Sequence, residues 1–148
     1  MWKTIFNKYN SNQSERMRNF DTDIIKIITA FENITGTEVR DCVNSRIVYF
    51  VVNKGKIATT IGKNGKNIKS AERILKKPIK VFEWDEDDEQ FLKNMIPKAQ
   101  KIQINGDSAV VTLSHENRGA IIGKDGSNIN AIRKFLERNS NIKKLKIL

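Results

Sequence analysis

Cysteine and histidine are nearly absent from this chain of 148 residues, which contains one of each. The lone cysteine, Cys42, excludes an intramolecular disulfide and any zinc site built on paired thiolates. We expect Cys42 to pack as a small buried residue in a strand. Together with the distant His115, it gives little support to a thiol hydrolase. The chain is predicted to hold no metal or cofactor and not to be an enzyme.

Long apolar segments are also missing. A membrane-spanning helix needs roughly 18 or more consecutive apolar residues, whereas the longest candidate here, Ile47 to Val52, is only as long as a strand. The first twenty residues are basic and polar and lack the apolar block of a signal peptide. We therefore expect a cytoplasmic protein without a membrane association.

Basic residues outnumber acidic ones, 27 against 17, for a net charge of +10. Five of the acids stand together between Asp85 and Glu89, so the rest of the chain carries 27 − 12 = +15. The positive electrostatic field of this charge attracts polyanions, because binding releases counterions from their phosphates. Basic charge is also common in proteins that bind acidic partners, so charge alone does not decide for nucleic acid.

A sixteen-residue segment occurs twice, 61 residues apart. Thr60 to Leu75 reads TIGKNGKNIKSAERIL and Ile121 to Leu136 reads IIGKDGSNINAIRKFL, with identical residues at seven positions. The flanking patterns repeat as well: each copy has a leading helix, two strands, a short helix, a Gly-x-x-Gly loop, a second helix and a closing strand. The repeat predicts two domains, residues 20–84 and 85–148, after a basic extension of residues 1–19.

Two local features refine this prediction. The acidic run would lie at the N-terminus of the second leading helix, expected over Glu89 to Ile96, where the helix dipole favours negative charge. The first leading helix is expected over Asp21 to Phe31. Asn105-Gly106 predicts a hairpin with a type I′ turn in the second copy.

The glycine loops suit the binding of a phosphate backbone. Glycine lacks Cβ, so a phosphate can approach the main chain, and the amide groups at the following helix N-terminus face the anion. Lys63 and Lys124 stand at the loop tips and can reach phosphate oxygens. Asn64 can donate hydrogen bonds, whereas Asp125 cannot and adds repulsion.

The helix after each loop has two faces. Apolar residues at positions i, i+3 and i+7 predict a core-facing stripe in both copies. Lys66 and Lys69 lie on another face, which is explained either by solvation or by contact with a nucleic acid, and we favour the contact because they stand beside a glycine loop. Nucleotide-binding enzyme motifs are absent, since Gly62 and Gly65 are separated by two residues rather than four and no Gly-x-Gly-x-x-Gly occurs.

The segments IGKNGKNIK and IIGKDGSNI resemble the I-G-x-x-G-x-x-I signature of KH domains, whose loop clamps about four nucleotides of a single strand. The element order resembles the type II KH arrangement, which implies an α+β fold with a mixed three-stranded sheet covered by helices in each domain. Two such units in succession are similar to the archaeal NusA family of transcription factors. That resemblance implies RNA binding in transcription elongation or termination, with RNA polymerase as a partner of a monomeric protein.

The resemblance assigns the RNA clamp to the matching positions of both loops, and we expect Asp125 to weaken the second clamp so that the first dominates. The isoleucine before each loop would line the groove for the bases. The predicted RNA-binding residues are Ile61, Gly62, Lys63, Asn64, Gly65, Lys66, Lys69, Ile122, Gly123, Lys124, Asp125 and Gly126.

Other functions are compatible with a KH pair. The protein could serve ribosome assembly or translation, or it could be an interaction adaptor whose KH folds no longer bind RNA. The intact glycines and the two tip lysines argue against the adaptor, because a packing module has no need for two exposed, phosphate-ready loops. The extension of residues 1–19 could be a tail or an additional RNA arm.

Overall fold

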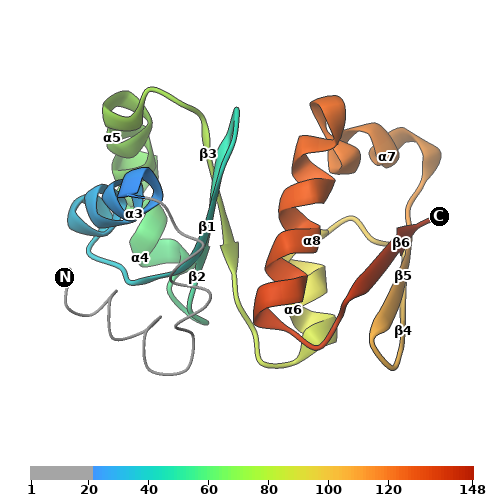
Figure 1. Ribbon diagram of the computed structural model, residues 1–148. Helices are drawn as coiled ribbons and strands as arrows, with labels where there is room; N and C mark the ends of the chain where they lie inside the picture. The colour runs from blue at the N-terminus through green and yellow to red at the C-terminus, as the bar shows by residue number, and fades with distance from the viewer. Residues whose placement is uncertain (1–21) are drawn as a thin grey trace. The chain divides into compact units, whose positions relative to one another are not determined.

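A computed structural model describes residues 22–148, and the expected N-terminal extension lies outside them (Figure 1). The described residues form two compact units that divide inside one strand, between Val81 and Phe82. Each unit has a three-stranded mixed sheet covered by helices, as the sequence predicted. Within this part of the chain, no helix is both long and apolar enough to cross a membrane.

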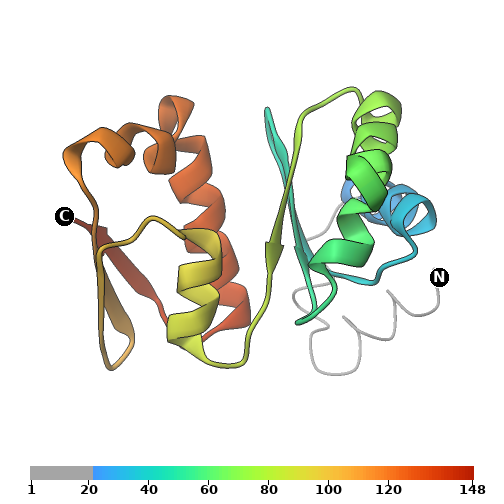
Figure 2. The same ribbon diagram turned by 180° about the vertical axis from the view of Figure 1, so that it is seen from behind.

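The first unit follows the predicted order of elements. Helices α3, α4 and α5 lie against one face of its sheet, as seen from both sides in Figures 1 and 2. Strands β1 and β2 are antiparallel, with an irregularity between Val39 and Asp41, and the sheet order is β1-β2-β3. Its elements are α3 (Thr22–Thr35), β1 (Val39–Asn44), β2 (Val48–Val52), α4 (Ile57–Ile61), the 3-10 turn η1 (Lys63–Gly65), α5 (Lys66–Leu75) and β3 (Ile79–Glu83).

The core of the first unit lies between α3, α5 and the sheet. Phe31 of α3 stacks on Phe50 of β2, with ring centroids 3.8 Å apart. Cys42 is 2% exposed within this cluster, so the prediction of a buried strand residue is confirmed. Ala71 of α5 is fully buried against the same cluster, which fixes the helix that follows the glycine loop.

Helix α3 is longer than the sequence indicated. It was expected to end at Phe31 but runs to Thr35. The added turn contains Glu32, which is fully buried and accepts a hydrogen bond from the backbone N–H of Val39 at the start of β1. A carboxylate normally marks a solvated position, so the sequence pattern ended the apolar stripe too early.

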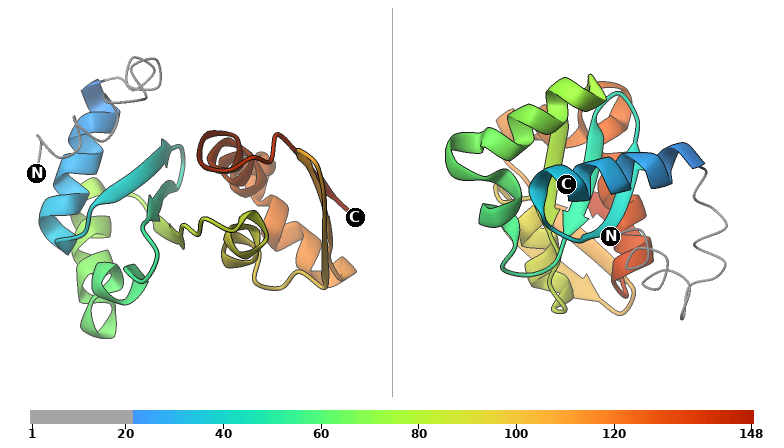
Figure 3. Two further views of the ribbon diagram at one scale, coloured as in Figure 1. Left: turned by 90° about the horizontal axis from the view of Figure 1, so that it is seen from below. Right: turned by 90° about the vertical axis from the view of Figure 1, so that its left-hand side faces the viewer.

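The second unit repeats the arrangement on a sheet of order β4-β5-β6. Strands β4 and β5 are antiparallel, whereas β5 and β6 are parallel. Helices α6 and α8 lie on one side of this sheet (Figure 3, left). The elements are α6 (Asp88–Met95), β4 (Lys101–Asn105), β5 (Ser108–Thr112), α7 (His115–Ile122), the 3-10 turn η2 (Lys124–Gly126), α8 (Ser127–Asn139) and β6 (Lys144–Ile147).

The acidic run has the structural role expected of it. Asp87 is the N-cap of α6, and its side chain accepts a hydrogen bond from the N–H of Glu89 at 3.3 Å. Asp85 is buried and accepts from the N–H of Asp87 at 2.9 Å, while Asp88 accepts from the N–H of Asn141 at 3.3 Å. Carboxylates here satisfy helix-terminal amides and favour the positive end of the dipole.

The turn of the β4–β5 hairpin differs from the predicted type I′. Asn105 pairs with Ser108, so the two turn residues are Gly106 and Asp107 rather than Asn105 and Gly106. Of these two, only Gly106 has a positive φ, 63°, which matches a type II′ turn. The hairpin lies where it was predicted, but its two turn residues are one position further along the chain.

Candidate nucleic-acid interface

The two glycine loops have the same backbone conformation. Gly62 has φ 80° and ψ 166°, and Gly123 has φ 78° and ψ 169°. At the third loop position, Asn64 has φ 58° and ψ 26°, and Asp125 has φ 56° and ψ 25°. Asn and Asp are the side chains that best tolerate this left-handed region. The repeated sequence therefore encodes one loop geometry twice.

The first glycine of each loop is required by space as well as by φ. A Cβ built on Gly62 would lie 2.8 Å from Cγ of Asn67, and one on Gly123 would lie 2.8 Å from Cβ of Asn128. The second glycine of the first loop, Gly65, also has a positive φ, but the nearest atom to its Cβ would be 3.8 Å away. The first glycines therefore let the loop fold back closely on the start of the next helix.

An asparagine joins the helices on either side of each loop. Asn67 Nδ2 donates to the carbonyl of Thr59 at 3.1 Å, and Asn128 Nδ2 donates to the carbonyl of Ile121 at 2.7 Å. Both carbonyls lie in the last turn of a short helix, where intrahelical partners are lacking. Both asparagines are among the identical positions of the repeat, but the sequence alone did not predict these hydrogen bonds. They hold helix, loop and helix as one rigid motif.

The predicted contact residues of each loop lie together at its surface. Lys63 and Asn64 are exposed in the first unit, and Lys124 and Asp125 are exposed in the second. Ile61 and Ile122, immediately before the glycines, are 37% and 40% exposed, which is unusual for isoleucine. Each loop thus combines a charged tip with an adjacent apolar side chain.

The helix after each loop begins without a side-chain cap and presents a basic face. Among the described residues, no side chain caps the N-terminus of α5 or α8. The first backbone N–H of each helix donates to the carbonyl of the loop lysine, so the positive end of the helix dipole is what each N-terminus offers to an anion. Lys66 and Lys69 are exposed on α5, whereas Ala71 and, on α8, Ile132 are buried in the cores as the stripe predicted.

Two successive units of helix, two strands, helix, Gly-x-x-Gly loop, helix and strand define the chain as a protein of two tandem type II KH domains. The solved structure titled "Crystal structure of APE1850" has the same fold, with a TM-score of 0.68 and 27% identity over 87% of this chain and 100% of that one. No protein-family model matches the chain.

Curated relatives identify the family. Proteins named "Probable transcription termination protein NusA" are 30% identical over 134 residues in Methanocaldococcus jannaschii and 33% identical over 135 residues in Methanococcus vannielii. These matches cover 86% of this chain and 73% and 78% of the relatives. The protein of the same name from Thermoplasma acidophilum is 30% identical, and the match covers 93% of its length. The chain belongs to the archaeal NusA family.

Proposed function

We propose that the protein is a transcription termination factor that holds single-stranded RNA on its two glycine loops. Membership in the NusA family supports the role in transcription. The observation that carries the RNA site is the identical geometry of two exposed Gly-x-x-Gly loops, each with a lysine at its tip. We also propose that it acts as a monomer in the cytoplasm.

The loop geometry suits a phosphate backbone. Gly62 and Gly123 leave no room for a Cβ beside Asn67 and Asn128, so these glycines keep each loop folded closely on the start of the next helix. Lys63 and Lys124 supply positive charge to the phosphates at the tips. The exposed Ile61 offers an apolar surface to a base beside the clamp. This is a binding function without chemistry, so no catalytic residue is proposed.

The two clamps differ in charge, and a reciprocal pair of substitutions tests whether the first dominates. Asp125→Asn removes a negative charge that would lie near a phosphate. It should raise RNA affinity about threefold, which corresponds to part of the free energy of one close ion contact in water. Asn64→Asp should lower affinity by a similar factor. Both side chains tolerate the same φ, as the two loops themselves show. Fluorescence anisotropy with a labelled RNA measures both; no gain for Asp125→Asn would contradict the proposed dominance.

An in vitro transcription assay with a cognate archaeal RNA polymerase tests the role in termination. Adding the protein should change the ratio of terminated to run-off transcript, and the protein should co-purify with polymerase rather than with ribosomal subunits. Co-purification with ribosomal subunits and an unchanged ratio would favour the translation alternative.

A further inference from the structure

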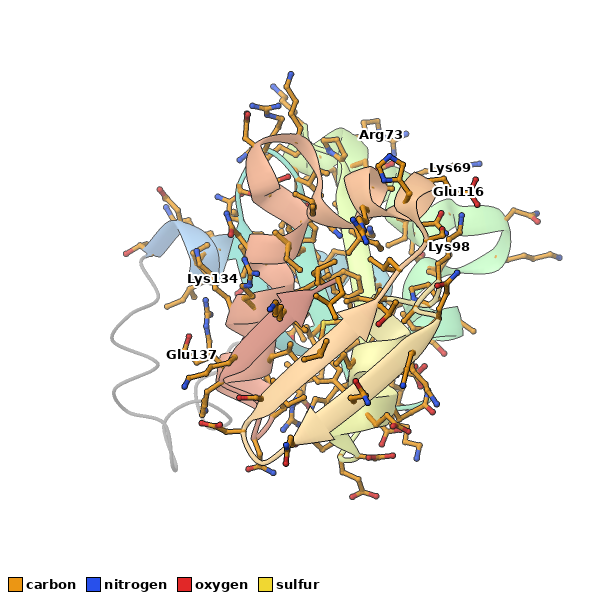
Figure 4. The ribbon with its side chains drawn as sticks, turned by 90° about the vertical axis from the view of Figure 1, so that its right-hand side faces the viewer. Lys69, Arg73, Lys98, Glu116, Lys134 and Glu137 are labelled. Atoms are coloured by element: carbon orange, nitrogen blue, oxygen red, sulfur yellow. The ribbon has the colours of Figure 1, made fainter. Side chains whose placement is uncertain are left out.

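The sheet of the second unit has one face that its helices do not cover. Buried Ala109 and Val111 of β5 define the inner face, against α6 and α8, and Leu145 of β6 pairs with Ala109 on the same side. Residues that alternate with these point outward. Figure 4 looks onto this open face, with the three strands in front of the helices.

The outward positions are basic or uncharged. The strand register places Lys101 of β4 opposite Thr112, and Lys144 and Lys146 of β6 beside Ser108 and Val110. All three lysines are exposed, and none takes part in an ion pair within residues 22–148. Among the outward positions of these three strands, none is acidic.

The basic surface continues around the edge of β6. Lys144 also lines a hollow of about 410 Å³ together with Arg133 and Lys143, where Glu137 is the acidic member. Figure 4 labels Glu137 on α8 at this edge of the sheet. The positive charge therefore extends from the open face onto a recess next to the strand.

The first unit does not share this feature on its two paired strands. On β1 and β2, the face opposite the core carries Val43, Tyr49 and Val51, all buried. Strand β3 places one lysine, Lys80, on that face of the first sheet, so the three exposed lysines of the second sheet are not a requirement of the repeated fold.

We propose that the open face of the β4–β5–β6 sheet is a second RNA contact, which binds the phosphate backbone without reading sequence. This inference rests on the proposed RNA-binding function. The face carries no aromatic side chain on which bases could stack, so lysine–phosphate contacts are the interaction it supports. Lys144 and Lys146 stand two residues apart on one strand, about 7 Å along it, a separation comparable with that of successive phosphates. An RNA longer than the second clamp would bind the loop and the sheet of the second unit together.

The test compares two RNAs, one of about four nucleotides, the length of a single clamp, and one of about 20. The sheet variant carries Lys144→Gln and Lys146→Gln. The control carries Lys26→Gln and Lys93→Gln, the same loss of charge on exposed residues of α3 and α6. The sheet variant should bind the long RNA about ten- to thirty-fold more weakly, the factor for two exposed ion contacts in water. The slope of log affinity against log salt should become shallower by about 1.4. Its affinity for the short RNA should not change.

Three results would overturn the inference. If the sheet variant binds the long RNA as tightly as the wild type, the open face is not part of the RNA site, while the loop proposal stands. If that variant then loses only its binding to polyglutamate, the face binds an acidic protein instead. An equal loss in the control variant would mean a general charge effect. Wild-type protein that binds neither RNA would refute the proposed function as well.

Discussion

Reversing the charge of the loop tips is expected to reduce affinity for single-stranded RNA at least about hundredfold. The variant carries Lys63→Asp, Asn64→Asp and Lys124→Asp. A lysine–phosphate contact near 4 Å contributes about 1 kcal/mol in water, and a charge reversal replaces this attraction with a repulsion of similar size. Two reversals and one added charge therefore exceed the 2.7 kcal/mol or so that corresponds to a hundredfold change. Fluorescence anisotropy at two salt concentrations measures the loss, and the salt slope should become shallower.

A control variant with the same total change of charge distinguishes the loss of loop contacts from a general effect of lower positive charge. Thr22→Asp, Lys26→Glu and Lys93→Glu alter exposed helix positions by five charges, as the loop variant does. This control should lose far less affinity. Circular dichroism should show both variants folded, because all six positions are exposed and Asp125 already occupies the backbone conformation of Asn64. A loop variant that binds like the control would count against the loops as the RNA site.

Replacing the first glycine of a loop is expected to cost about 3 kcal/mol of unfolding free energy. In Gly62→Ala, the new Cβ would have to occupy a φ of +80° and would lie 2.8 Å from Asn67 Cγ. A φ of +80° with a ψ of 166° is a conformation that essentially only glycine adopts and costs an L-residue roughly 1–3 kcal/mol, and a forced close contact adds a similar amount. Relief of the contact would move Asn67 from the Thr59 carbonyl, so RNA affinity should fall as well.

Gly55→Ala is the matched comparison for this prediction. Gly55 has the same φ of +80° but no heavy atom within 4 Å of a built Cβ. Gly55→Ala should therefore lose only the part of the unfolding free energy that comes from the backbone conformation, about 1–2 kcal/mol. Urea unfolding curves measure both variants. Equal losses would show that the close approach of the loop to Asn67 is not what requires glycine at position 62.

The repeat made much of the fold predictable. Two copies with the same glycine spacing fixed the element order, the two sheets and the positions of both loops. The apolar stripe that includes Ala71 and Ile132 predicted which helix face is buried, because helical periodicity depends on local sequence alone. The acidic run could be placed at a helix N-terminus for the same reason, since the dipole acts within one turn.

What escaped prediction depends on contacts between segments distant in sequence. Glu32 is buried in the last turns of α3, where its carboxylate accepts from the first N–H of β1, seven residues on. Asn67 and Asn128 were visible as identities, but the carbonyls they bind are known only once the short helix is placed. The outward lysines of the second sheet require the pairing register of three strands, which a one-residue shift would reverse.

Amide NMR shifts during a titration with a four-nucleotide RNA test the assignment of RNA binding to the glycine loops. We expect the largest changes at residues 62–66 and 123–127, where the loops lead into α5 and α8, with the first loop saturating at lower RNA concentration. Shift changes confined to other surfaces, with both loops unaffected, would contradict the assignment of RNA binding to the glycine loops.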